Sequence, residues 1–312
     1  MSRTRWLTLL VWSITIALVI WALQQVSWPE TWQTLRRLTP AALALLILLN
    51  TCVLLALTAR WRVFVKALAS DAVSLRAIFQ ARIAAFSVSY FTPGPQFGGK
   101  PLQVIGLKQQ GVPSAEATAT VALDKLLELL TNFTVLAIGA LALWQVGLAD
   151  NEHRAWFSVL TLCLLALPLV YLVALWRGRL PFSVLFHWWA ARRRAGKLKR
   201  WLSILAESES LSGAIAQQRP GVIIAGLLWA GIAWALMLLE FGLSARLLGI
   251  PLSPAETLAA LTAARFAFLL PMPGGLGALA SSQEIPARLN EIFDINRGRA
   301  LRPGPAPEAF AW

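Results

Sequence analysis

The sequence predicts an all-α polytopic membrane protein, a helical bundle with two re-entrant or broken-helix hairpins arranged as an inverted repeat. Three observations lead to this fold class. The 312 residues are 57% hydrophobic and only 14% charged, whereas soluble domains are roughly half apolar and about a quarter charged. Several apolar runs reach the length of about 20 residues that crosses a bilayer. Two Pro/Gly clusters interrupt apolar segments at corresponding places in the two halves.

Five apolar runs are predicted to cross the membrane: Trp6–Leu23, Pro40–Leu57, Leu126–Val146, Trp156–Trp176 and Gly221–Glu240. The first is too long for a removable signal peptide and lacks a small-residue cleavage site, so we expect it to remain as the first span. Cys52 and Cys163 fall inside spans, and with His153 and His187 they give no metal-ligand spacing. We therefore expect no metal and no cofactor.

The net charge of +13 lies in the predicted loops, which favours a membrane surface over nucleic acid. The segment PFSVLFHWWAARRRAGKLKRW is predicted to be an interfacial amphipathic helix over anionic lipid. The loop that contains it has no acidic residue and these basic ones: Arg177, Arg179, Arg192, Arg193, Arg194, Lys197, Lys199 and Arg200. We expect this loop to be cytoplasmic, in a multi-pass protein of the cytoplasmic membrane.

The same charge rule orients the first half of the chain. Arg3 and Arg5 place the N-terminus in the cytoplasm, and the acidic loop ADNEHRA at residues 149–155 is expected outside. A second cytoplasmic loop is marked by Arg60, Arg62, Lys66 and Arg76. An odd number of crossings must then lie between these two loops, and one is the helix from Ser114 to Gly147, about 50 Å long.

Residues Leu75 to Gly111 must therefore enter and leave on the same side. Leu75–Phe91 is short for a span and carries Arg76, Gln80 and Arg82, and a break, TPGPQFGG, follows at residues 92–99. We predict a re-entrant hairpin from the cytoplasm whose broken tip lines a cavity, because non-helical backbone at membrane depth needs protein or water around it.

A matching pattern occurs in the second half. The segment PAETLAALTAARFAFLLPMPGGLG, residues 254–277, is again a short apolar helix with one arginine, Arg265, followed by a Pro/Gly break. By the charge argument this hairpin enters from outside, which predicts an inverted repeat with a binding site at its interface. The transmembrane domain would cover residues 1–285, with halves at about 1–147 and 156–285. Two kinked helices in an ordinary bundle are the alternative.

Charged residues inside predicted spans are the candidate site. Asp124 and Glu128 share one helix face, and Lys125 lies beside them. Such a stripe either faces a cavity or forms a structural ion cluster. Arg82 and Arg265 either contact a phosphate or snorkel toward the headgroups.

Three further charged residues are interpreted from their positions along the chain. Lys100 is a headgroup contact or, slightly favoured, a solvated loop charge. Glu240 and Glu256 are nearer the span ends and are expected at the membrane interface.

Two segments resemble signature regions of the lysylphosphatidylglycerol synthase transmembrane-region family, whose members are flippase-like membrane proteins. The first is TPGPQFGGKPLQVIGLKQQGVPSAEATATVALDKLLEL, and the second is LLPMPGGLGALASSQ. The resemblance implies lipid-site roles for Lys100, at a motif position, and for these matched motif residues: Thr92, Pro93, Gly94, Gly98, Gly99, Pro273, Gly274, Gly275 and Gly277. Lys100 and Ala280 stand where the family usually has acids. The family continues into a further apolar helix, so we expect the polar, Pro-rich residues 286–312 to be a truncated or atypical end.

Three functions stay open at this point. The first is a lipid flippase that moves a polar or phospholipid headgroup, for example aminoacylated phosphatidylglycerol or an isoprenoid or glycolipid. The second is an intramembrane enzyme with Asp124 or Glu128 as acid or base, disfavoured because no nucleophile-base pair or metal cluster is evident. The third is a non-transporting partner of a lipid synthase. We expect membrane lipids, anionic or headgroup-modified, as ligands, no catalytic residue, and no nucleic acid.

Overall fold

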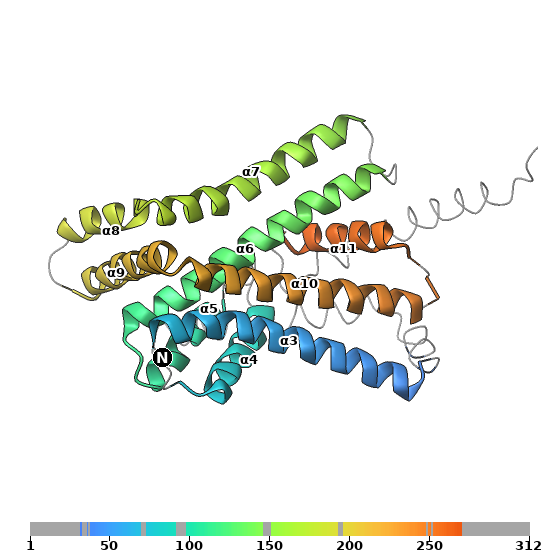
Figure 1. The fold of residues 1–312 in the computed structure, drawn as a ribbon, viewed down its shortest axis with the longest axis horizontal. Coiled ribbons are helices and arrows are strands. Elements are labelled where there is room, and N and C mark those ends of the chain that lie inside the picture. Colours follow the sequence, from blue (N-terminus) through green and yellow to red (C-terminus); the bar gives the residue numbers. More distant parts are fainter. Residues whose placement is uncertain are drawn as a thin grey trace, which may run out of the picture.

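The computed structural model describes residues 38–69, 73–91, 98–145, 151–192, 196–247, 249–250 and 252–269, together with Trp32 and Arg36. These residues form nine helices, α3 to α11, and no strand (Figure 1). The all-α prediction is therefore confirmed for this part of the chain. The predicted first span, Trp6–Leu23, and the tail at 286–312 lie outside the described residues.

The helices are α3 Pro40–Leu68, α4 Leu75–Phe91, α5 Lys100–Gln109, α6 Ser114–Gln145, α7 Asn151–Trp176, α8 Pro181–Ala191, α9 Lys197–Gln218, α10 Pro220–Leu247 and α11 Pro254–Leu269. The predicted bounds of α4 and the predicted start of α6 are confirmed. The helix expected before the second Pro/Gly break is α11. The predicted loop after residue 57 is wrong, because α3 continues to Leu68.

Two of the described helices, α3 and α10, are long and apolar enough to cross a membrane, or three spans are present if Leu162–Trp176 and α8 form one bent span. At about 1.5 Å per residue, the 29 residues of α3 extend over about 43 Å, which exceeds a hydrocarbon core of about 30 Å. The outer faces of α3 and α10 expose large apolar side chains such as Ile47, Leu48 and Leu228. Apolar faces of this kind are stable in contact with the hydrocarbon of a bilayer.

Proline and glycine mark the helix boundaries. Pro40, Pro101 and Pro181 stand in the first turns of α3, α5 and α8, where the missing N–H has no helical partner to lose. Helices α5 and α7 end in the same glycine motif. Gly111 and Gly178 adopt φ values of 86° and 72°, and the next residue's N–H reaches back to the last turn of each helix.

Helix α6 is the centre of the bundle and contacts α3, α5, α7, α9, α10 and α11 (Figure 1). Helices α3 and α10 lie side by side along their length. One apolar cluster joins α3, α4, α5 and α6 around Trp61, Ile78 and Leu107. A second joins α3, α6, α9 and α10 around Phe64 and Leu127. Apolar packing therefore fixes α6 against both groups of helices.

The predicted interfacial helix is in fact two helices, α8 and α9. Helix α8 is bent by 81° from Leu162–Trp176, and Trp188 carries Arg192 over its ring at 3.3 Å. The buried Glu209 of α9 accepts hydrogen bonds from the backbone N–H groups of Phe182 and Ser183. A carboxylate at these unpaired first-turn donors stabilises the helix start. One long helix could not place Glu209 there, so the turn at Gly196 is required.

Helices α4 and α5 pack together as a hairpin. Gly99, immediately before α5, lies so close to α4 that an added Cβ would be 1.8 Å from the carbonyl oxygen of Ala85. Its N–H donates to Ser89 Oγ at 3.0 Å. The pairing of two short helices fits the predicted hairpin, while its re-entry into the membrane and the inverted repeat with α11 stay predictions.

We expect Gly99→Ala to destabilise the protein by about 1–3 kcal/mol, because the new methyl group meets backbone that cannot rotate away. Gly231→Ala on α10 is the matched control, since a Cβ there meets nothing within 4 Å. Thermal unfolding of the two variants in detergent measures the difference. Equal stability of both variants would contradict the close approach of α4 and α5.

Candidate functional site

The middle of α6 carries the charged residues that form the centre of the site. Asp124 has no exposed surface, Lys125 is buried, and Glu128 is partly buried one turn further on. The helix places Asp124 and Glu128 on one face, as their spacing predicts. Buried charges are costly unless they are paired and hydrogen-bonded. Each carboxylate should therefore have cationic partners.

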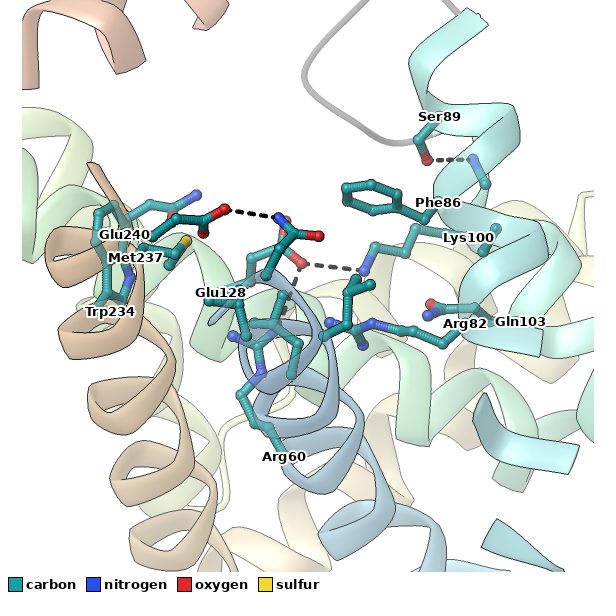
Figure 2. Close-up of a pocket in the computed structure, with 17 residues that line it drawn as sticks. Arg60, Arg82, Phe86, Ser89, Lys100, Gln103, Glu128, Trp234, Met237 and Glu240 are labelled. Atoms are coloured by element: carbon teal, nitrogen blue, oxygen red, sulfur yellow. Dashed lines mark hydrogen bonds and ion pairs between the residues drawn. The ribbon is translucent and has the colours of Figure 1, made fainter. Parts of the chain in front are cut away.

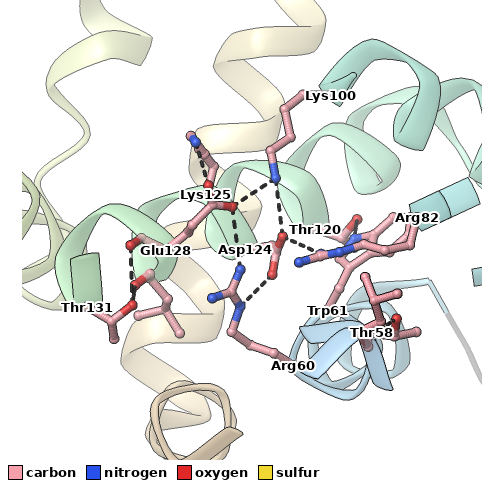
Figure 3. Close-up of polar contacts among 12 residues, drawn as sticks. Thr58, Arg60, Trp61, Arg82, Lys100, Thr120, Asp124, Lys125, Glu128 and Thr131 are labelled. Atoms are coloured by element: carbon pink, nitrogen blue, oxygen red, sulfur yellow. Dashed lines mark hydrogen bonds and ion pairs between the residues drawn. The ribbon is translucent and has the colours of Figure 1, made fainter. Parts of the chain in front are cut away.

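Asp124 is paired with cations from three other helices (Figure 3). Arg60 of α3 donates from Nε to Oδ1 at 2.8 Å, and Arg82 of α4 donates from Nη1 to Oδ2 at 2.9 Å. Lys100 Nζ, at the first residue of α5, lies 3.5 Å from the same Oδ2. Both oxygens of the carboxylate are used, so this one group connects α3, α4 and α5 to α6.

Glu128 completes the network. Lys125 Nζ donates to Oε1 at 2.6 Å, and Lys100 Nζ donates to Oε2 at 3.1 Å. Arg60 Nη2 lies 3.5 Å from Oε2. Lys100 and Arg60 therefore each contact both carboxylates, and the six side chains form one continuous network, which we call the charge cluster (Figure 3).

A cavity of about 310 Å³ adjoins the charge cluster (Figure 2). Helices α3, α4, α5, α6 and α10 line it, and Gly99 lies beside it. Its polar lining consists of Asn50, Arg60, Arg82, Ser89, Lys100, Gln103, Glu128, Asn132 and Glu240. Phe86, Trp234 and Met237 are among its apolar residues. Charged and apolar groups therefore both line one space.

Two expectations about charged residues are wrong. Arg60 is not a loop residue but is buried in α3, with 1% of its surface exposed. Lys100 is not a solvated loop charge, because it bridges the two carboxylates. Glu240 lines the cavity, where its Oε1 accepts a hydrogen bond from Asn50 Nδ2 at 3.0 Å, and its interfacial position stays a prediction. The snorkelling alternative for Arg82 is also excluded, since its guanidinium points to Asp124.

Glu256 lies in the first turn of α11, and its interfacial position stays a prediction. Its carboxylate accepts from Ser253 N–H at 2.8 Å, and Ser253 Oγ accepts from Glu256 N–H at 3.3 Å. This reciprocal pair is a capping box at the beginning of α11. It satisfies helix donors and takes no part in the cavity.

The other predicted site residues are described only in part. Gly98 and Gly99 form the turn before α5. Arg265 lies on α11, but its side chain is outside the described part. The remaining motif residues are outside it altogether: Thr92, Pro93, Gly94, Pro273, Gly274, Gly275 and Gly277. Their roles stay predictions.

Sequence reasoning missed Arg60, and a signal for it was present. Leu49, Val53 and Ala56 precede it at helical spacing, and Phe64 follows it by four residues; all are buried on one face of α3. Arg60 continues that buried face. Among the described residues, no group of three His, Cys, Asp or Glu side chains could hold a metal ion.

Comparison with known families identifies the chain. The family model for the lysylphosphatidylglycerol synthase TM region matches residues 6–281. The chain belongs to this family. Membership and the apolar helices together make it a membrane protein of the lysylphosphatidylglycerol synthase type. No curated protein and no solved structure matches the chain.

Within this family member, the pairing at Asp124 predicts a stability effect. Asp124→Asn leaves Arg60, Arg82 and Lys100 short of one negative charge in a buried site. Loss of one partner from a buried ion pair typically costs about 3–5 kcal/mol, and we expect a loss of this size. Thermal unfolding in detergent measures it, and Glu116→Gln near the start of α6 is the matched control.

A double variant separates the ion pairs from other effects. Arg82→Met combined with Asp124→Asn should lose less stability than the two single variants together, because they share one interaction. Strict additivity of the two losses would contradict the pairing.

Proposed function

We propose that the protein moves the polar headgroup of a membrane lipid between leaflets through the cavity, while the acyl chains remain in the surrounding lipid. One observation carries the proposal: a space of about 310 Å³ with a charged and polar lining lies within a bundle whose outer faces are apolar. Charged groups inside membrane helices commonly mark substrate pathways. Family membership supports the same class of function.

The position of the cavity along α3 supports a route at bilayer depth. Asn50 and Arg60 both line it, and ten residues of helix separate them, which is about 15 Å. Asn50 lies in the middle of the apolar run Pro40–Leu57. The cavity therefore extends from the middle of this run toward the charge cluster.

The lining supplies what a headgroup loses on leaving water. Transfer of an unpartnered polar group to hydrocarbon costs several kcal/mol, and an unpaired charge costs more. Lys100, Arg60 and Asn132 offer donors in the cavity, and Glu128 and Gln103 offer acceptors. Replacing water by these groups lowers the barrier to crossing.

The hairpins and the orientation belong to the proposal. Helices α4 and α5 would enter from the cytoplasm, and α11 with its following break would enter from outside, as two inverted halves of a multi-pass protein. The N-terminus and the basic α8–α9 segment would face the cytoplasm, with exposed Arg192, Lys197 and Arg200 near anionic headgroups.

The enzyme alternative is less well supported. A general base needs a carboxylate that reaches its substrate and readily accepts a proton. Both oxygens of Asp124 already accept from cations, and Glu128 is paired with two lysines. An arrangement of this kind stabilises charge better than it transfers protons.

We expect Lys100→Gln to lower the rate of leaflet redistribution of fluorescent phosphatidylglycerol in proteoliposomes about tenfold, which corresponds to about 1.4 kcal/mol in the barrier. The reason is that Lys100 is the cation shared between the cavity and both carboxylates. Lys108→Gln, on the exposed side of the same helix, is the matched control and should transport normally.

Equal redistribution by the wild type and by protein-free liposomes would reject transport. Equal rates for the two lysine variants would reject the role of the cavity. Recovery of a chemically changed lipid from the same vesicles would favour the enzyme alternative.

The orientation of α4 gives a separate prediction. Ser87 is exposed on this helix, so Ser87→Cys in a background without Cys52 and Cys163 should react with a membrane-impermeant maleimide added from the cytoplasmic side. Labelling of inverted and right-side-out vesicles measures the side of access. Reaction from the outside alone would contradict a cytoplasmic hairpin.

A further inference from the structure

We propose that the angle between α7 and α8 binds an anionic membrane phospholipid, which places one acyl chain in an apolar groove and its phosphate beside Arg179. The groove is separate from the cavity at the charge cluster, since no described residue lines both. The lipid would be held there and not transported, so the inference goes beyond the proposed function and does not rest on it. Three features carry it: the lining of the groove, the hydrogen bonds that fix its walls, and its charge.

The groove lies where α7 and α8 meet, at the edge of the bundle (Figure 1). Its volume is about 820 Å³, and Leu162–Trp176 and α8 form an angle of 81° around it. Arg179 is the one charged residue of the lining. The other lining residues are Cys163, Ala166, Leu167, Val170, Tyr171, Ala174, Leu180, Pro181, Phe182 and Val184. An apolar surface of this kind favours hydrocarbon over water.

The dimensions of the groove suit one acyl chain. Its α7 wall runs from Cys163 to Ala174, which is about 16 Å at about 1.5 Å per residue. One leaflet contributes about 15 Å to a hydrocarbon core of about 30 Å. With Leu162–Trp176 across the bilayer, α8 lies nearly in the plane of its surface, because the two helices are almost perpendicular. The groove would then face the acyl chains of one leaflet, with Arg179 at the level of the headgroups.

The walls of the groove are held in place by Glu209 of α9. This buried carboxylate accepts hydrogen bonds from the Tyr171 hydroxyl at 3.1 Å and from the Phe182 N–H at 3.2 Å. Tyr171 belongs to the α7 wall and Phe182 to the α8 wall, and their rings meet edge to face with centroids 5.2 Å apart. One carboxylate therefore fixes both walls. A preformed groove binds a ligand without the entropic cost of ordering its sides.

The charge around the groove selects an anionic lipid. Arg179 is exposed and forms no ion pair with any described residue. The chain from Arg177 to Ala206 contains no Asp or Glu. Basic segments next to a membrane helix attract anionic headgroups, and the planar guanidinium fork matches phosphate oxygens. A phosphatidylcholine headgroup carries its own cation and gains less from Arg179.

Cys163 is a natural reporter for this site, because it is exposed and lines the groove. The full-length Cys52→Ser protein, which keeps Cys163 as its single cysteine, is purified in detergent and delipidated. The rate of Cys163 alkylation by N-ethylmaleimide is then measured against increasing phosphatidic acid or phosphatidylcholine with identical acyl chains. We expect phosphatidic acid to protect Cys163 at an about fivefold lower concentration, the effect of one basic residue near anionic lipid. Glycerol 3-phosphate, which has no acyl chain, should give no protection.

Three variants in the same background connect the protection to residues. Arg179→Gln should remove the preference for phosphatidic acid. Arg177→Gln is the matched control, since Arg177 is also exposed but does not line the groove. Lys100→Gln should leave the protection unchanged, because Lys100 lines the other cavity. Thermal unfolding without lipid checks that the two exposed arginine variants remain as stable as the parent protein.

Equal protection by the two lipids, or an unchanged preference in Arg179→Gln, would overturn the anionic assignment. Absence of protection by either lipid would overturn the lipid site and leave the groove to a protein partner. Leaflet redistribution without lipid-dependent protection of Cys163 would reject this site and keep the proposed function. Protection without redistribution would keep this site and reject the proposed function.

Discussion

The buried carboxylate of Asp124 is the interaction on which the arrangement of the first helices depends. It is enclosed within the bundle, and its two oxygens are held by Arg60 and Arg82, with Lys100 close by. A charge in this position is stable only with all its partners present. The three cations come from α3, α4 and α5, so the electrostatic requirement of one side chain on α6 sets the positions of three neighbouring helices.

Apolar packing and ion pairing both hold α6 to its neighbours. Leu123 and Leu127 pack toward Phe64 and the helices α9 and α10, while Asp124 and Glu128 meet the cations. Apolar packing holds the helices together, and the charged side chains line a polar cavity beside them. In this member of the lysylphosphatidylglycerol synthase TM family, the combination separates an apolar exterior from a polar interior space of about 310 Å³.

The sequence predicted helices better than it predicted which charges are buried. The end of α4 was predicted from the Pro/Gly break at residues 92–99, and the start of α6 from Ser114. Such signals act locally along the chain. Arg60 was misplaced because the loop charge rule was applied after residue 57, where α3 in fact continues. Lys100 was misplaced because its partners are 24 and 28 residues away. Pairing across helices cannot be read from one segment, although the periodicity of α3 pointed to Arg60.

The cavity lining has three cations, Arg60, Arg82 and Lys100, and two carboxylates, Glu128 and Glu240. This net positive charge also bears on the ion gradients across a membrane. A polar passage in a bilayer is a route for protons and sodium ions unless something opposes them. Positively charged side chains lining a pore raise the energy of a cation inside it. In the proposed transport, Arg60, Arg82 and Lys100 would oppose the passage of inorganic cations, so that a polar interior is compatible with a membrane that holds an ion gradient.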